Sequence, residues 1–196
     1  MYNTTQRIHL TQFSTVTAAT ENPVSTTTAK LHMRVTYNDE DTNIATYISA
    51  ATAIAQLQTN RQFCTATFKA ITNQWPADEF VIHKNPVQSV SWVKYYDANN
   101  ELQTLSTANW QLETINEPAT LRILEFPTLY DRPDAVQIQF IAGYGAASTV
   151  PGNIISALLL FTAHLFEHRE TVGPAQMFEV PQTAQTLLNL STVPFY

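Results

Sequence analysis

The chain has 196 residues and a net charge of −6, with 44% hydrophobic residues but only 13% charged ones. This length supports one domain with its own core, or one core with a modest inserted subdomain, and excludes two large independent domains. No two Lys or Arg residues are adjacent in the acidic chain, which excludes the electrostatic footprint of a sequence-specific nucleic-acid binder. A surface of uncharged polar groups is typical of a protein that packs against copies or partners.

Cysteine usage and hydropathy indicate the compartment. Cys64 is the only cysteine, so no intrachain disulfide can form, and nothing points to an oxidising compartment. The first residues, MYNTTQRIHLTQF, lack the charged start and apolar core of a secretory signal. The apolar stretch 154–166 is too short to span a bilayer. We therefore expect assembly in the cytoplasm and no membrane contact.

The N-terminal third predicts an arm followed by two helices. Residues 1–23 are rich in Thr and Asn and fit either one strand or an extended arm, and we expect an arm. Ser25 is placed to cap a short helix over about 25–36. A longer helix is predicted over 41–59, with Asp41 as its cap and Asn60 as the left-handed residue that closes it. Its apolar positions recur at helical spacing: Ile44, Tyr47, Ile48, Ala51, Ile54 and Ala55.

From 63 to 145 the hydrophobic period changes to two, which predicts an inserted antiparallel β region. The turn at 97–100 lies between two alternating segments and predicts a hairpin. Prolines divide the region into about five or six short strands, as in an antiparallel sheet or small sandwich. The strand aromatics Trp75, Trp92, Trp110, Tyr95 and Tyr96 are expected to fill the core or cover a sheet face, with one exposed Trp as an alternative interface anchor.

The C-terminal quarter predicts one apolar helix and an apolar tail. Pro151 opens a helix over about 151–169, and apolar residues cover most of its circumference, so it must be surrounded by its own fold or by a neighbouring subunit. The expected buried stripe is Ile155, Leu158, Leu159, Thr162 and Phe166. Gly173-Pro174 ends regular structure, and the tail 171–196 is too apolar to be a solvated appendage. It either folds back on its own domain or docks on a partner.

One string has an enzyme-like spacing. Residues 164–168, His-Leu-Phe-Glu-His, match the HxxEH pattern of inverted zinc peptidases, in which two histidines one helical turn apart bind the metal and Glu167 acts as general base. Such a site needs a third ligand, and only Glu170 and Glu179 follow. The simpler interpretation is a polar helix end where a cation suits the helix dipole. Nucleophile elbows and phosphate-binding glycine loops are absent from the sequence, so we expect no enzyme activity, catalytic site, metal or cofactor.

Three segments together resemble the head-tail connector, or adaptor, family of long-tailed phages, the head-completion proteins placed beneath the portal. The first is AKLHMRV at 29–35, followed by the acidic cluster 39–41 and the helix 44–58. The second is FIAGYG at 140–145, then Val150-Pro151 and the helix that runs into 164–170. The third contains Val180-Pro181, Leu187-Leu188 and Pro194. In the family the position of His168 tends to hold Asn, which argues further against the zinc alternative.

The resemblance implies an α+β fold: a small helical bundle with an inserted antiparallel β-sheet region and an extended C-terminal tail. Residues 1–23 would be an arm, 24–170 the connector domain and 171–196 a docking tail. The implied function is structural: a dodecameric ring in the neck of the virion, below the portal, which extends the DNA channel and offers a platform to stopper or tail proteins. DNA would pass through the ring without sequence-specific binding. A tail-completion or capsid-surface protein is a rival within the same structural class.

Two sets of apolar residues are the expected contact sites. Portal or partner contacts are expected at Met177, Phe178, Leu187, Leu188, Leu190, Phe195 and Tyr196. Packing between subunits is expected at Ile155, Leu158, Leu159, Phe161 and Phe166.

Overall fold

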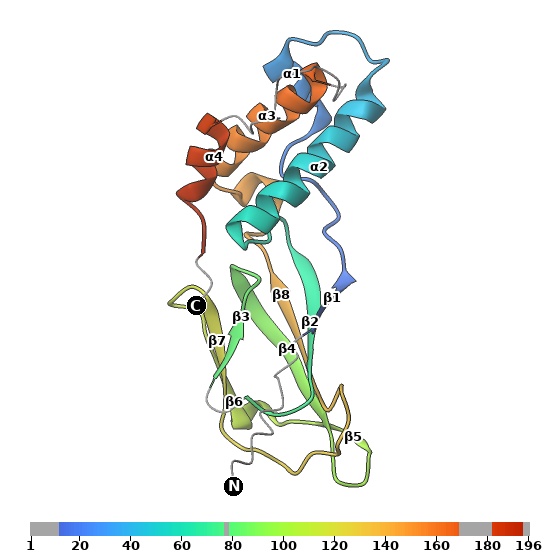
Figure 1. The fold of residues 1–196 in the computed structure, drawn as a ribbon, viewed down its shortest axis with the longest axis vertical. Helices are drawn as coiled ribbons and strands as arrows, with labels where there is room; N and C mark the ends of the chain where they lie inside the picture. The colour runs from blue at the N-terminus through green and yellow to red at the C-terminus, as the bar shows by residue number, and fades with distance from the viewer. Residues whose placement is uncertain (1–11, 77–78, 169–181, 194–196) are drawn as a thin grey trace, which may run out of the picture.

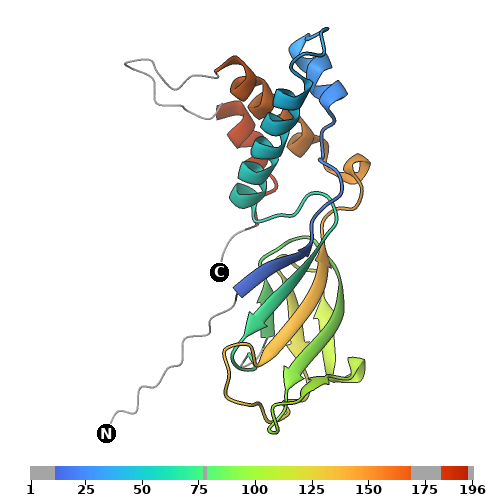
Figure 2. The same cartoon turned by 90° about the vertical axis from the view of Figure 1, so that its right-hand side faces the viewer.

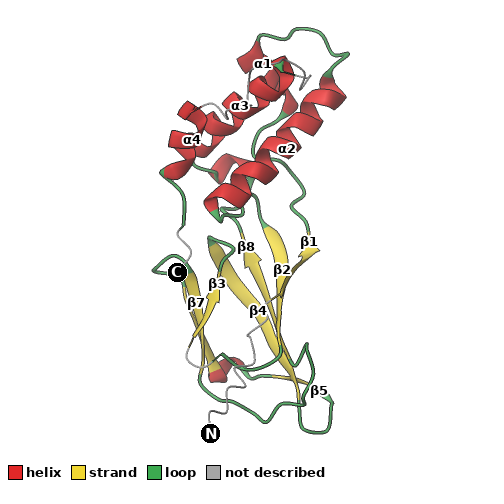
Figure 3. Ribbon diagram, in the orientation of Figure 1, coloured by secondary structure: helices red, strands yellow, loops and turns green. Residues whose placement is uncertain are grey.

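The computed structural model describes residues 12–76, 79–168 and 182–193. The described chain is elongated, with a helical bundle at one end and a β-subdomain at the other (Figure 1). The same division holds in the perpendicular view (Figure 2). Helices come from both ends of the chain, and most strands come from the middle (Figure 3). The β-subdomain is therefore an insertion into a helical protein, as the sequence predicts.

The first two helices are α1 (Thr26–Met33) and α2 (Asp41–Thr59). Ser25 caps α1 as predicted, because its hydroxyl accepts a hydrogen bond from the Thr28 amide at 3.1 Å. Asn60 closes α2 in the left-handed conformation, with φ 56°. The predicted cap at Asp41 is wrong: Asp41 is the first residue of α2, and its carboxylate instead accepts from Lys30 Nζ at 2.6 Å, which ties α1 to α2.

The other two helices complete the bundle. Helix α3 (Gly152–Glu167) follows a short 3₁₀ turn at Ala147–Thr149, and α4 is Gln182–Asn189. One hydrophobic cluster joins the buried sides of all four helices, and Ile44, Ile48, Ile154, Leu158 and Leu188 are each at most 1% exposed within it. Within the part of the chain that the structure describes, no helix is long and apolar enough to cross a membrane.

The β-subdomain contains two antiparallel sheets. The larger one has the strand order β1-β2-β8-β4-β5, and the smaller one has the order β3-β7-β6. The strands of the larger sheet are β1 (Gln12–Thr17), β2 (Ala66–Thr72), β8 (Val136–Ala142), β4 (Val87–Tyr96) and β5 (Leu102–Thr104). Those of the smaller sheet are β3 (Glu79–Ile82), β7 (Ala119–Ile123) and β6 (Trp110–Glu113), which begins after a 3₁₀ turn at Thr107–Asn109.

The core of the β-subdomain lies between the two sheets. Alternate residues of β2 and β8 are buried, as the period of two predicts, and Phe68 stacks on Phe140 with ring centroids 5.7 Å apart. Leu121 and Ile123 of the smaller sheet belong to the same buried cluster. The predicted hairpin is confirmed: β4 pairs with β5, and Asp97 accepts from the Asn99 and Glu101 amides in the turn between them.

Two predictions about the ends of the described chain are wrong. Gln12–Thr17 is not an arm but strand β1, which pairs antiparallel with β2. The C-terminal segment is not wholly extended, because Gln182–Asn189 forms α4 and packs its Ala184 and Leu188 into the helical core. The described residues of the region 63–145 also form seven strands, one more than the largest number expected.

The helical bundle and the β-subdomain meet where the chain passes between them. The Thr65 amide donates to the Gly145 carbonyl at 2.9 Å, so the chain segments that enter and leave the β-subdomain lie side by side. Gly143 lies at this crossing with φ +127° and packs directly on the Cys64–Thr65 peptide. A side chain there would collide with backbone, which explains the first glycine of the FIAGYG segment.

Candidate assembly surfaces

The outward face of α2 is uncharged after its first residue, Asp41. No charged residue occurs between Thr42 and Thr59, although one side of the helix faces solvent. Thr46, Ala50, Ala53 and Leu57 follow one another on this exposed side at spacings of three and four residues. Leu57 is 79% exposed and Ile54 is 45% exposed. An isolated surface helix normally carries charge on its solvent side, so this face has the composition of a contact surface.

Helix α3 is covered mostly by its own bundle. Its buried residues are Ile154, Ala157, Leu158, Phe161 and Thr162. The buried side of α3 is therefore rotated about the helix axis from the predicted one, since Ile155, Leu159 and Phe166 of the predicted stripe are only partly buried. Of the residues expected to pack between subunits, Leu158 and Phe161 lie within the protomer's own core, and Ile155, Leu159 and Phe166 retain some accessible surface.

The residues of and near α4 that were expected to contact a partner differ in their exposure. Leu188 was expected to contact a partner, but its side chain is fully buried within the protomer itself. Leu187 is partly buried, and Leu190 is 76% exposed. Asn153 of α3 fixes the helix by donating to the Leu187 carbonyl at 2.9 Å. The other expected contacts, Met177, Phe178, Phe195 and Tyr196, lie outside the described residues.

The segment after α4 returns to the end of α2. The Val193 amide donates to the Thr59 carbonyl at 3.0 Å, and Asn60 Nδ2 donates to the Val193 carbonyl at 2.8 Å. These bonds place residue 193 at the boundary between the bundle and the β-subdomain, so the C-terminal end of the described chain is held by one backbone and one side-chain hydrogen bond.

Arg61, directly after α2, connects the helical bundle, the β-subdomain and the segment after α4 at this boundary. Its guanidinium donates to both carboxylate oxygens of Glu117 in the β-subdomain, at 2.9 and 2.5 Å, and also to the Ser191 carbonyl after α4. Its Cζ lies 5.7 Å from the centre of the Tyr144 ring. The arginine side chain is 11% exposed and that of Glu117 36% exposed, so the guanidinium is largely covered while the carboxylate stays in contact with water. The sequence alone gave no signal for this role, since Arg61 and Glu117 are 56 residues apart.

The HxxEH string lies at the C-terminal end of α3. The His164 and His168 rings are 4.6 Å apart, as expected of residues one turn apart. The His168 amide donates to the His164 carbonyl and closes the helix. Among the residues that the structure describes, no group of three or more His, Cys, Asp or Glu side chains is close enough to hold a metal. Glu170 and Glu179 lie outside those residues. The geometry matches the structural interpretation, in which two histidines end a helix.

Sequence comparison identifies the family. A model described as "Phage gp6-like head-tail connector protein" matches residues 25–125, which include α1, α2 and much of the β-subdomain. The chain belongs to the phage gp6-like head-tail connector family. This membership confirms the expectation of a structural subunit that connects head and tail of a phage particle. No curated protein matches the connector in sequence.

Solved structures share the connector's fold over nearly its whole length. A chain from the "Neck of empty GTA particle computed with C6 symmetry" is 21% identical with a TM-score of 0.79, where GTA is a gene transfer agent. A chain from the "Virion of native gene transfer agent (GTA) particle" is 22% identical with a TM-score of 0.77. A chain from the "Neck of native GTA particle computed with C12 symmetry" is 21% identical with a TM-score of 0.69. Each alignment covers 94% of the connector and 97% of the solved chain.

Proposed function

We propose that the connector is one subunit of a twelve-membered ring in the neck of a phage particle, between the portal and the tail proteins. The observation that carries this proposal is the family match, together with the shared fold of chains from necks computed with six-fold and twelve-fold symmetry. A ring needs two different surfaces on each protomer, because one face of every subunit contacts the opposite, unlike face of the next subunit.

The uncharged face of α2 is our candidate for one of these surfaces. Leu57 and Ile54 would be buried against the next protomer, and the small residues Thr46, Ala50 and Ala53 would allow close approach. The same residues would otherwise expose apolar area to water without a partner. The partly buried side chains Ile155, Leu159 and Phe166 of α3 remain candidates for the same ring contacts.

A charge placed on the α2 face tests this assignment. We expect Leu57→Lys to fold normally, because the side chain is 79% exposed, but to fail to form rings on portal-bearing heads. Ile115→Lys is the matched control, because Ile115 is 90% exposed in the loop between β6 and β7. Negative-stain imaging of the heads measures ring occupancy. Equal occupancy for the two variants would remove α2 from the ring interface.

The portal contact is proposed for the residues around and beyond α4. Leu190 is 76% exposed, beside the partly buried Leu187, and Met177, Phe178, Phe195 and Tyr196 add apolar character nearby in sequence. Because Leu188 belongs to the core, an informative deletion must leave α4 intact. A chain that ends at Val193 should keep its melting temperature yet bind portal-bearing heads weakly. Normal binding of this truncated chain would contradict the assignment.

We also propose that the connector has no catalytic role and that DNA passes through the ring without being gripped. The net charge of −6 supports this, since an acidic ring repels the phosphates and lets a duplex slide. The two histidines of the HxxEH string support a structural role, as their surroundings among the described residues supply no third ligand. Stoichiometric zinc in the purified protein, together with failed assembly of a His168→Ala variant, would overturn this part. The connector would act in the virion neck after assembly in the host cytoplasm.

A further inference from the structure

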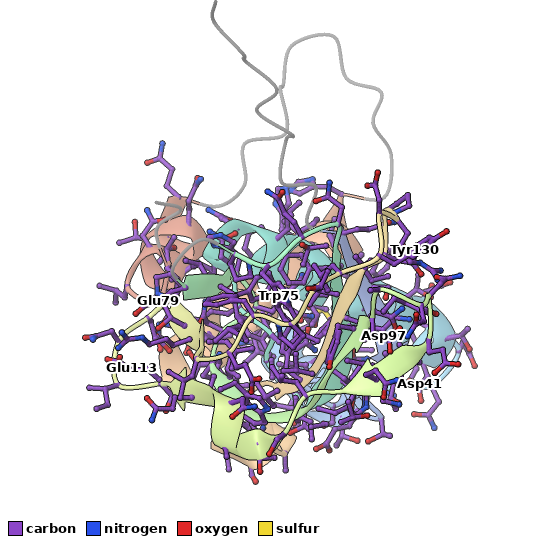
Figure 4. All side chains as sticks on the ribbon, turned by 90° about the horizontal axis from the view of Figure 1, so that it is seen from below. Asp41, Trp75, Glu79, Asp97, Glu113 and Tyr130 are labelled. Atoms are coloured by element: carbon purple, nitrogen blue, oxygen red, sulfur yellow. The ribbon has the colours of Figure 1, made fainter. Side chains whose placement is uncertain are left out.

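The end of the β-subdomain farthest from the helices is built by three segments, 73–76, 95–101 and 124–134, which we call the distal end. Figure 4 shows the molecule from this side, with Trp75 near the middle of the view and Asp97 and Tyr130 nearer its edge. The Tyr130 amide donates to the Tyr96 carbonyl at 3.0 Å, so the long loop 124–134 is fastened to the end of β4.

An aromatic cluster holds the distal end in shape. The Trp75 ring centroid lies 5.6 Å from that of Tyr95 and 6.3 Å from that of Phe126. Trp75 Nε1 donates to the Pro127 carbonyl at 2.8 Å, so the indole fixes the backbone of the loop as well as its side chains. The loop is therefore preorganised, which lowers the entropy cost of binding a partner.

The same loop turns apolar side chains outward. Phe126 is 50% exposed, Leu124 is 47% exposed and Tyr130 is 44% exposed, within a stretch of seven residues. None of the three belongs to the hydrophobic core of the β-subdomain, whose members Leu121 and Ile123 are at most 3% exposed. Aromatic side chains such as Phe and Tyr are enriched at the centres of protein interfaces.

The charge of the distal end selects the partner. The three segments contain five carboxylates, Asp97, Glu101, Glu125, Asp131 and Asp134, and one basic residue, Arg132. The Arg132 guanidinium already donates to both carboxylate oxygens of Asp134, and its Cζ lies 3.5 Å from the centre of the Tyr96 ring. Asp97 and Glu125 bond to neutral amides, so these bonds leave their charges in place. The aromatic centre therefore has an acidic rim.

We propose that the distal end is a docking surface for a protein whose contact face combines apolar side chains with Lys or Arg. This inference rests on the proposed place of the connector in the neck, and it assigns the tail-side contact to the β-subdomain. Charge complementarity favours this occupant over the others. Nucleic acid, an anionic membrane and the distal end of a second copy would each bring negative charge against the acidic rim.

The test joins connector-loaded heads to purified tails of the same particle and scores two quantities separately by electron microscopy: heads that carry a ring, and ringed heads that carry a tail. We expect the double variant Phe126→Ser/Tyr130→Ser to form rings as the wild type does and to join tails at least tenfold less often. Ile115→Ser removes an even more exposed apolar side chain in the loop between β6 and β7; it is the control and should join tails normally. Absence of wild-type rings on heads would refute the proposed function and not this inference.

A charge reversal tests the rim without touching the aromatic cluster. Glu125→Lys should reduce tail joining on ringed heads, and added salt should reduce joining of the wild type more than that of the variant. Wild-type joining by both Glu125→Lys and the double variant, with rings present, would overturn the proposal. If only the double variant lost tail joining, and joining of the wild type did not depend on salt, the proposal that the partner carries Lys or Arg would be refuted. Stacking of purified wild-type rings through their distal ends would identify a second copy as the occupant and would also overturn it.

Discussion

Adding a methyl group at Gly143 should destabilise the connector strongly. A Cβ built on this residue would lie 2.7 Å from the Cys64 carbonyl oxygen and 2.8 Å from both the Cys64 carbonyl carbon and the Thr65 nitrogen. All three are backbone atoms, so no rotamer change relieves the collision. The φ of +127° adds about 1–3 kcal/mol for a non-glycine residue, and overpacking adds about 1–3 kcal/mol. We expect Gly143→Ala to lose about 4 kcal/mol of unfolding free energy.

Gly152→Ala is the matched control. Its Cβ would meet nothing within 4 Å, and alanine at the first residue of α3 should leave stability unchanged or raise it by about 0.5–1 kcal/mol. Urea unfolding followed by circular dichroism measures both variants, and in a chain of this size a loss of about 4 kcal/mol lowers Tm by about 8–16 °C. Equal stability of the two variants would refute the argument that close backbone contact at the crossing requires glycine at 143.

Three further predictions use side chains in different environments. Leu188→Ala should cost about 2–5 kcal/mol in urea unfolding, and Leu190→Ala less than about 0.5 kcal/mol, because only Leu188 is buried; similar losses would contradict the assignment of α4 to the core. Burial raises the pKa of the Cys64 thiol to about 11, so at pH 8 it should react with a thiol reagent slowly in the native protein and rapidly in urea; equal rates would contradict its burial. The hydrogen bond from Arg132 lowers the pKa of Asp134, so the stability that this bond provides is present above about pH 3.9 and is lost as the pH falls through the lower pKa of the folded state. The urea midpoints of the wild type and of Asp134→Asn should therefore converge as the pH is lowered through this range. A difference that stays constant with pH would exclude the linkage.

Local signals in the sequence were sufficient for α2, α3 and the β4–β5 hairpin. The bounds of α2 agree with the prediction because helical spacing, a left-handed Asn60 and the absence of Pro and Gly all agree over one segment. The hairpin follows from alternation on both sides of a turn built on Asp97. These are contacts between residues close in sequence, which periodicity reports well.

Contacts between distant residues explain what the sequence left open. The alternation in residues 12–17 fits an arm or a strand equally, and pairing with β2 some fifty residues later decides for a strand. Helix α3 is apolar on most sides, so its pattern could not tell which side the bundle covers. Ile54 fitted the buried stripe of α2 by spacing, yet the structure leaves it 45% exposed. The spacing of Ala184, Leu187 and Leu188 was the available signal for α4.

The adjacent crossings at 65 and 145 have an evolutionary consequence. Because the two chain segments touch, recombination between related genomes can replace the intervening strands as a cassette without moving the helices that precede and follow them. The cassette still depends on residues outside it, since β1 lies before α1 yet pairs with β2, and Arg61 donates to Glu117 within the cassette. A successful exchange must therefore bring residues 12–17 with it or retain a compatible β2, which limits how freely such genomes can combine neck modules.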